Sequence, residues 1–227
     1  MRYCCAFFSI CLLLLTACQS VPVSRRDLMR SGEEAIEAGE YEQAVGYYTQ
    51  LIQNEPQTAE GYNGRGVARM CQSRYEEALE DLEQARKLDA ENEVYCYNIG
   101  LCLYCMGKYE DAIGSFSQAL ALKPDYTDSL CQRGAAYAHL EKYDQAEADI
   151  RRAGELKPGI SAKFWAALGA AYKEDQAFDR ALSAYTEAIL AEKDQPEWYL
   201  QRADVYMLQG DYEQARQDLV QAIGMQE

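Results

Sequence analysis

Apolar residues recur along most of the chain with helical spacing, in short stretches separated by turns. Two of these stretches, 94–106 and 110–122, are each about 13 residues long and carry apolar side chains three and four positions apart. Gly107 stands between them, and glycine is the residue on which a helix most readily ends in a left-handed conformation. The pattern therefore predicts two amphipathic helices joined by one turn.

This pair of stretches recurs along the chain at a regular interval, and the same kinds of residue return in fixed columns. A column of small residues comes early in each period: Gly32, Gly66, Gly100, Gly134, Gly169 and Ala203. An aromatic column follows it: Tyr41, Tyr75, Tyr109, Tyr143, Phe178 and Tyr212. Alanine stands three positions after each aromatic: Ala44, Ala78, Ala112, Ala146, Ala181 and Ala215. One extra residue near 158–162 is the single break in the period. Such internal repetition is the mark of a stacked repeat protein.

These columns resemble the tetratricopeptide repeat, in which a small residue, an aromatic-x-x-Ala step, a second alanine and a late proline follow one another within about 34 residues. The resemblance covers about 25–227. It implies an all-α fold, a right-handed α-solenoid of six tandem repeats with two antiparallel helices each. The repeats are predicted at 25–58, 59–92, 93–126, 127–160, 162–195 and 196–227.

The columns have a direct physical interpretation. A single helix pair cannot bury its own apolar face, so the stability of the chain is roughly a sum over interfaces between neighbouring repeats. The small residues let the two helices of a repeat approach closely, and the alanines do the same for the next repeat. We expect the aromatic column to fill the wedge between them.

The segment 1–17 has the pattern of a signal peptide. No side chain between Tyr3 and Ala17 is charged, and about 15 residues of helix rise only about 22 Å, less than the roughly 30 Å hydrocarbon core. Leu15-Thr16-Ala17-Cys18 is similar to a bacterial lipobox, which implies cleavage before Cys18 and lipid attachment to it. The segment 18–24 would then form a short linker. The alternative is an ordinary secretory signal in which Cys18 is incidental.

If Cys18 carries the lipid, the protein is a membrane-anchored lipoprotein that faces the extracytoplasmic side, on the cell membrane or the outer membrane. Two or three acyl chains give stable anchoring where one does not. The net charge limits what else the chain binds: 22 Lys and Arg against 37 Asp and Glu give −15. Nucleic acid is therefore not expected as a partner, because basic residues supply most of the affinity for phosphate backbones. A basic or hydrophobic peptide fits this charge better.

The sequence has little that predicts catalysis or a cofactor. His139 is the only histidine, no serine stands in a nucleophile elbow, and no glycine-rich loop is suited to phosphate. The acidic residues follow the polar faces of the predicted helices. We therefore predict that the protein is not an enzyme and holds neither a cofactor nor a metal.

The cysteines are the one feature that could change this view. Cys102 and Cys105 form a C-x-x-C inside a predicted helix. Cys71, Cys105 and His139 share one column of three successive repeats. Equivalent points on stacked helices lie about 8–10 Å apart, whereas zinc ligands lie about 2.0–2.3 Å from the ion. We therefore expect packing cysteines that act as small hydrophobes. A disulfide or metal site, and with it a redox or metal-binding protein, is the minor alternative.

The resemblance also implies where a partner binds, because in this family the first helices of the repeats line a concave groove. The residues expected to line it are Asn63, Val67, Met70, Tyr97, Asn98, Leu101, Tyr104, Gln132 and His139. An extended or helical peptide with apolar anchors suits this surface, and the amides of Asn63, Asn98 and Gln132 would pair with its backbone. Alternatively, some of the apolar members belong to the core between repeats. The cations of the family's carboxylate clamp are missing here.

The predicted function is thus a non-catalytic protein–protein interaction scaffold, lipid-anchored outside the cytoplasm, that binds a peptide or protein partner in cell-envelope assembly or maintenance. The alternative is a self-associating structural protein of the envelope. Leu219, Val220 and Ile223 in the last repeat favour this alternative, because they could leave apolar surface exposed at that end.

Overall fold

The computed structural model describes residues 23–157 and 159–225, which form twelve helices and no strand. The first helices of the six pairs are α2 (Arg25–Glu37), α4 (Ala59–Cys71), α6 (Glu93–Cys105), α8 (Thr127–His139), α10 (Ala162–Glu174) and α12 (Pro196–Gln209). The second helices are α3 (Tyr41–Asn54), α5 (Tyr75–Leu88), α7 (Tyr109–Leu122), α9 (Tyr143–Leu156), α11 (Phe178–Ala191) and α13 (Tyr212–Gly224). The predicted all-α solenoid of six two-helix repeats is confirmed.

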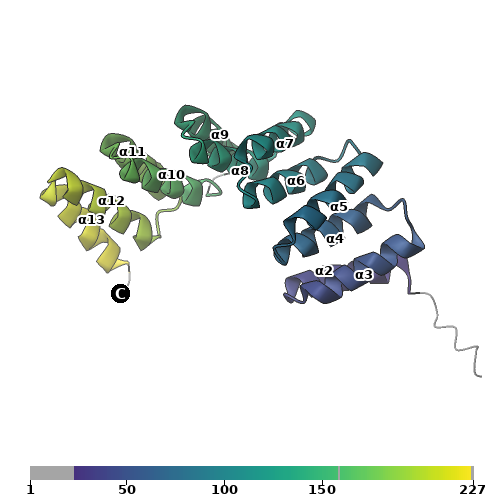
Figure 1. Ribbon diagram of the computed structural model, residues 1–227. Coiled ribbons are helices and arrows are strands. Elements are labelled where there is room, and N and C mark those ends of the chain that lie inside the picture. Colours follow the sequence, from purple (N-terminus) through teal and green to yellow (C-terminus); the bar gives the residue numbers. More distant parts are fainter. Residues whose placement is uncertain (1–22, 158, 226–227) are drawn as a thin grey trace, which may run out of the picture.

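The helix pairs follow one another along an arch, with α4, α6, α8 and α10 toward its inside and the second helices toward its outside (Figure 1). The predicted signal peptide, Cys18 and most of the linker lie outside the described residues. Ser24, the last linker residue, caps the N-terminus of α2: its hydroxyl accepts a hydrogen bond of 3.2 Å from the backbone N–H of Asp27, as a helix N-cap does.

The turn inside each pair depends on one residue in the left-handed conformation. In three repeats this residue is a glycine, with φ of 76° at Gly39, 74° at Gly107 and 81° at Gly210. In the other three it carries a side chain, with φ of 60° at Ser73, 57° at Glu141 and 59° at Gln176. The same turn therefore forms with or without glycine, at an energetic cost in the second case.

The small column does bring the two helices of a repeat together. The side chain that packs against each glycine of this column comes from the middle of the second helix. A Cβ atom on Gly100 would lie 2.6 Å from the ring of Phe116, and one on Gly32 would lie 2.6 Å from the ring of Tyr48. Phe116 and Tyr48 stand seven positions after Tyr109 and Tyr41. Tyr109 and Phe116 are seven positions, or two helical turns, apart, so they share a face of α7. Only Phe116 is level with Gly100 on the neighbouring helix. The aromatic column packs between neighbouring repeats, as expected: Tyr109 stacks on His139 of the next repeat, and Tyr143 lies against Tyr172 of the next.

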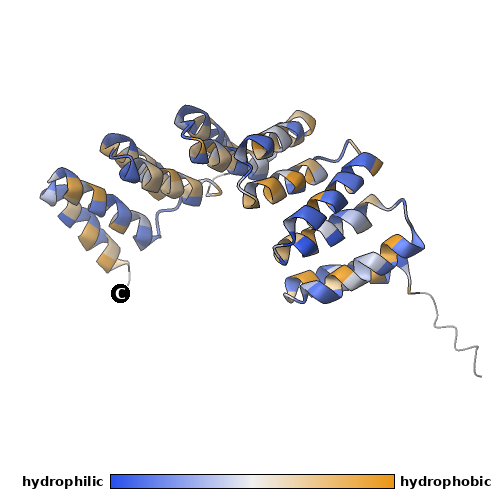
Figure 2. Cartoon of the chain, in the orientation of Figure 1, coloured by the Kyte–Doolittle hydropathy of each residue, from blue (hydrophilic) through white to orange (hydrophobic). Residues whose placement is uncertain are grey.

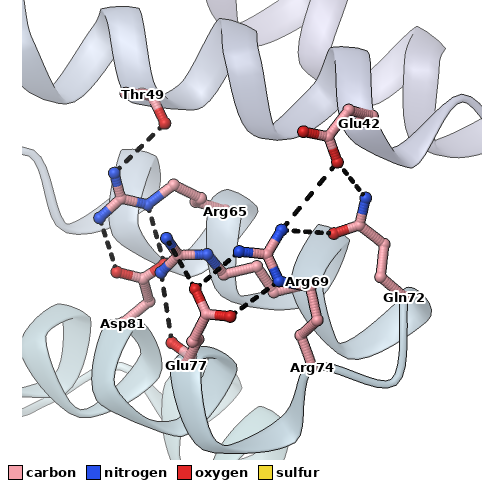
Figure 3. Close-up of polar contacts among 8 residues, drawn as sticks. All are labelled: Glu42, Thr49, Arg65, Arg69, Gln72, Arg74, Glu77 and Asp81. Atoms are coloured by element: carbon pink, nitrogen blue, oxygen red, sulfur yellow. Dashed lines mark hydrogen bonds and ion pairs between the residues drawn. The ribbon is translucent and has the colours of Figure 1, made fainter.

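A buried ion pair joins the helices of repeats two, four and six, and the sequence analysis missed it. The guanidinium of Arg65 donates two 2.8 Å hydrogen bonds to the carboxylate of Asp81 and one of 3.3 Å to the Thr49 hydroxyl of the preceding repeat (Figure 3). Arg69 donates a further bond of 2.6 Å to Asp81. The same arrangement recurs in two more groups of three residues: Arg133, Asp149 and Ser117, and Arg202, Asp218 and Thr186.

This network alternates along the solenoid. Repeats three and five carry the aliphatic residues Ile99 and Leu168 where Arg65, Arg133 and Arg202 stand in the even repeats. The hydroxyl partners come from repeats one, three and five, so each group links an odd repeat to the even repeat after it. The packing unit therefore spans two repeats, about twice the period visible in the sequence columns.

The apolar surface is uneven. Helix α6 is mostly hydrophobic along its length, whereas α5 beside it is mostly hydrophilic (Figure 2). In the last repeat large apolar side chains reach solvent: Tyr212 is 72% exposed, Val220 60% and Ile223 59%.

Among the described residues, no helix combines the length and the apolar character that crossing a membrane requires.

Candidate functional site

The nine residues predicted to line the groove lie on three neighbouring helices of the inner layer. Helix α4 carries Asn63, Val67 and Met70, α6 carries Tyr97, Asn98, Leu101 and Tyr104, and α8 carries Gln132 and His139. Seven of them are half-buried. The two exceptions are Asn98, which is buried, and His139, which is exposed. The inner surface of repeats two to four is thus a continuous band of apolar and aromatic side chains, interrupted by amides.

Tyr97 lines the inner surface and also packs against the core between the repeats. Its ring centroid lies 5.9 Å from that of Phe116, which is fully buried, and 5.1 Å from that of Tyr126 in the turn before α8. Burial, followed by the nearby Asp128 carboxylate, raises the pKa of Tyr97. Such aromatic contacts stabilise the packing of α6 against its neighbours, so Tyr97 helps to hold together the helices that form the groove.

Three rings cluster near the C-terminal ends of α6 and α8. The His139 imidazole stacks on Tyr109 with centroids 4.3 Å apart, and its Nε2 lies 2.8 Å from the hydroxyl of Tyr104. The rings of Tyr104 and His139 meet edge to face at 5.4 Å. This cluster fixes the orientation of Tyr104 and gives the groove a rigid aromatic edge with one polar pair.

The predicted amides are not equally available. The Asn98 side-chain N–H donates a hydrogen bond of 2.7 Å to the Asn63 side-chain oxygen, and Asn98 is 9% exposed. These two amides are therefore paired with each other across α4 and α6. No hydrogen bond joins the Gln132 side chain to another residue within the described ranges, which leaves Gln132 as the amide free to contact a ligand backbone.

Two cavities open along the inner layer. One, of about 180 Å³, lies between α6, α8 and α10, and Tyr104, His139, Phe164 and Leu168 are among its lining residues. The second, of about 270 Å³, lies between α2 and α4. Its walls include Met29, Ile36, Val67, Asn63 and Tyr95, its floor includes Tyr48, and Glu33 and Glu60 also line it. We call it the repeat-one cavity.

Sequence reasoning missed the repeat-one cavity, although a signal for it exists. Gly64 stands where the next two repeats place Asn98 and Gln132. A glycine at a position where the next two repeats carry amides leaves the inner surface without a side chain there. The missing side chain exposes the ring of Tyr48 from α3, which lies directly behind Gly64 and forms the floor of the cavity. This contact between helices is not visible in the sequence.

A larger cavity, of about 900 Å³, lies on the outer face between α5 and α7, with Arg86, Lys87 and Gln118 among its lining residues. Cys96 lies at its base, where the equivalent positions of other repeats hold larger side chains: Leu28, Tyr62, Leu130, Trp165 and Tyr199. A small side chain in a column of large ones therefore accounts for this cavity.

The five cysteines of the described chain are all free thiols. Cys96, Cys102 and Cys131 are buried, as expected of packing cysteines, and burial raises the pKa of Cys102 to about 11. Cys71 and Cys105 are exposed, so the expectation that they pack as small hydrophobes was wrong. Cys71 is the last residue of α4 and Cys105 the last residue of α6, and at these helix ends their side chains are not covered by a neighbouring helix. Within the described residues, no group of three or more His, Cys, Asp or Glu could hold a metal ion.

Stacked helix pairs with a continuous inner surface define an α-solenoid repeat protein. Models of the tetratricopeptide repeat match residues 29–93, 94–126, 127–159 and 166–224. The chain therefore belongs to the tetratricopeptide repeat family, whose members are generally non-catalytic scaffolds for protein–protein interaction.

Similar proteins come from distant sources. Over 61 residues, 27% of this chain, the sequence is 46% identical to sperm-associated antigen 1 of Mus musculus, and this match spans only 7% of that protein. The structure of pilF from Pseudomonas aeruginosa has a TM-score of 0.70 at 17% identity and covers 86% of this chain and 88% of its own. YrrB, a protein with an unusual peptide-binding site, has a TM-score of 0.60 at 21% identity, covering 83% and 93%. The two structures show the fold alone.

Proposed function

We propose that this chain is a non-catalytic scaffold that binds a peptide or protein partner along the inner face of α4, α6 and α8. One observation carries the proposal: the half-buried apolar and aromatic residues of these helices form a continuous surface with a cavity at each end. A surface of this kind supplies apolar contact area, and Gln132 supplies a hydrogen-bonding group for a backbone.

The partner proposed is basic or apolar in character. The chain has a net charge of −15, which favours encounter with positively charged surfaces and disfavours anionic ones. The site of action proposed is the outer side of a membrane, in envelope assembly or maintenance, because the lipobox-like Leu15-Thr16-Ala17-Cys18 precedes the solenoid by few residues.

The test is site-specific photo-crosslinking in cells that produce the full chain. A photoreactive phenylalanine analogue replaces Tyr104 on the inner face in one variant and Leu122, an exposed residue at the end of α7, in the other. We expect a discrete adduct from position 104 and none from position 122. Equal adducts from both positions, or none from position 104, would contradict a groove-binding function.

Protein purified from the same cells tests whether Cys18 carries a lipid anchor. Mass spectrometry of its N-terminal peptide is expected to find Cys18 as the first residue with diacylglycerol on its sulfur. An N-terminus at Met1, or an unmodified thiol at Cys18, would refute lipid anchoring while leaving the groove proposal unaffected.

A second candidate function is self-association through the last repeat, which is favoured by the exposure of Tyr212, Val220 and Ile223. The charges of α13 are already neutralised, since Arg216 pairs with Glu213 at 2.8 Å and Asp218 with Arg202 at 2.7 Å. This face is therefore locally neutral on a strongly acidic molecule, so two copies could meet here with little repulsion.

A further inference from the structure

We propose that the repeat-one cavity binds a lysine side chain of the partner. This inference rests on the proposed function, which it deepens by naming one side chain that the groove recognises. Three observations carry it: a hydroxyl without a hydrogen-bond partner at the floor of the cavity, an unpaired carboxylate beside it, and aliphatic side chains along the wall.

The floor of the cavity is the tip of Tyr48. This tyrosine belongs to α3, in the outer layer, and its ring reaches inward between the two inner helices. A Cβ on Gly32 of α2 would lie 2.6 Å from the ring, and one on Gly64 of α4 would lie closer still. Both positions must therefore be glycine for the ring to pass, and its hydroxyl arrives at the inner face.

The Tyr48 hydroxyl has no partner. Tyr48 is 2% exposed, and no hydrogen bond links its hydroxyl to any residue in the described part of the chain. Burial, and then the nearby Glu33 carboxylate, raise the pKa of Tyr48 to about 12, so the phenol is neutral at physiological pH. The Tyr48 hydroxyl oxygen is not among the fully enclosed polar atoms of the described chain, so a ligand in the cavity can reach it and donate a hydrogen bond to it.

Glu33 supplies the negative charge. Its neighbour on α2, Arg30, is engaged with Asp27 at 3.1 Å and Glu34 at 3.8 Å. No ion pair involves Glu33 among residues 23–157 and 159–225, and no lysine or arginine lines the cavity there. Glu60, the other carboxylate of the cavity, is held by Arg25 at 3.0 Å. A cation entering the cavity therefore meets one carboxylate that is not already neutralised.

Aliphatic side chains form much of the remaining wall. Met29, Ile36 and Val67 line it together with Asn63, Gly64 and Tyr95. The volume of about 270 Å³ is smaller than the roughly 300–1,000 Å³ typical of sites for small molecules and suits a single long side chain. Lysine combines a four-carbon stem with a compact cation that donates three hydrogen bonds. Arginine is the nearest competitor, because its planar guanidinium can pair bidentately with one carboxylate such as Glu33. Lysine suits the cavity better, because its three rotatable donors can reach acceptors on two different helices, Glu33 on α2 and Tyr48 on α3.

Among the described residues, no other repeat offers this combination. The equivalent side chains of the second helices have no hydroxyl in repeats two, three, four and six, where they are Leu82, Phe116, Ile150 and Leu219. Tyr185 in repeat five does have one, but its hydroxyl oxygen is enclosed by the protein. The assignment is therefore specific to the junction of repeats one and two.

The test uses the full chain and three blocked pentapeptides: acetyl-Gly-Gly-Lys-Gly-Gly-amide, its norleucine analogue, which has the same stem without the ammonium, and its arginine analogue. Binding is followed by NMR of the methyl groups of Met29, Ile36 and Val67. We expect the lysine peptide to shift these methyl signals and to bind about fivefold more tightly than the norleucine peptide. Equal binding of the two, or tighter binding of the arginine analogue, would overturn the proposal.

Variants separate the cavity from general electrostatic attraction. Glu33→Gln and Tyr48→Phe are each expected to raise the Kd of the lysine peptide about threefold or more. Glu34→Gln, which removes the same charge from an exposed neighbour outside the cavity, is expected to leave it unchanged. Tyr48→Phe is expected to fold, since Phe116 occupies the equivalent position. Equal weakening by Glu33→Gln and Glu34→Gln would refute the site.

This experiment and the photo-crosslinking experiment fail independently. The peptide titration needs no natural partner, so lysine binding without an adduct at position 104 would overturn the groove function alone. An adduct without lysine selectivity would overturn the lysine subsite alone.

Discussion

At the scale of single residues, the turn inside each helix pair shows how one position tolerates different chemistry. Gly107 adopts its φ of 74° without steric penalty, whereas Gln176 holds a φ of 59° with a side chain. A residue with a Cβ in the left-handed region is destabilised by about 1–2 kcal/mol. Three repeats of this chain carry glycine at this position and three carry a residue with a side chain, so the sequence varies there while the backbone does not.

Replacing Gln176 by glycine is therefore expected to stabilise the protein by about 1 kcal/mol. Gln176 is exposed, and no hydrogen bond involves its side chain within the described residues, so the substitution removes strain without removing a contact. The midpoint of urea denaturation measures the change. The reciprocal substitution Gly107→Gln is expected to lower the midpoint, and an unchanged midpoint in both variants would contradict the explanation.

At the scale of elements, the approach of two helices depends on which glycine faces the partner helix. Gly100 in α6 faces Phe116, and a Cβ there would lie 2.6 Å from the ring. Gly114 in α7 faces outward, and a Cβ there would meet nothing within 4 Å. Both glycines lie inside helices of the same repeat, but only one of them is required by packing.

Alanine substitution at these two positions is expected to have opposite effects. Gly100→Ala forces Phe116 or the helices to move and should destabilise the protein by about 1–3 kcal/mol. Gly114→Ala removes only the conformational freedom of glycine and should stabilise it by roughly 0.5–1 kcal/mol. Thermal unfolding followed by circular dichroism compares them directly. Effects of the same sign would show that the close approach of α6 and α7 is not set by Gly100.

At the scale of the whole molecule, the arch has two chemically different ends. In α2, at one end, the exposed side chains include Arg26, Arg30, Glu33 and Glu34. In α13, at the other, Tyr212, Val220 and Ile223 are exposed. An apolar end does not match a charged one. If copies of the chain associate, we therefore expect contact between two last repeats, related by a twofold axis.

Light scattering over a range of concentrations tests this expectation. The full chain in a detergent micelle should approach twice the protein mass of the monomer as concentration rises, and Ile223→Glu should keep it monomeric by placing a charge in the contact. Leu190→Glu is the control, because Leu190 is 61% exposed but lies on α11. A mass that does not depend on concentration would rule out self-association.

The sequence by itself determined the repeat and its elements. The regular period, the small column and the turn at Gly107 predicted six helix pairs, and the expected stretch 110–122 begins one position after the observed α7, Tyr109–Leu122. These features are local: helical spacing and turn residues act within a few positions of the chain, so they are visible in the sequence alone.

Only the tertiary structure decided which side chains meet. The passage of Tyr48 between Gly32 and Gly64, and the pairing of Asn63 with Asn98, depend on how close neighbouring helices come and how they are rotated. Each of these contacts joins residues from different helices, and residues in one column, such as Gly64 and Asn98, have different neighbours. The physical reason is that periodicity fixes the face of a helix on which a residue lies, whereas packing between helices fixes what that residue touches.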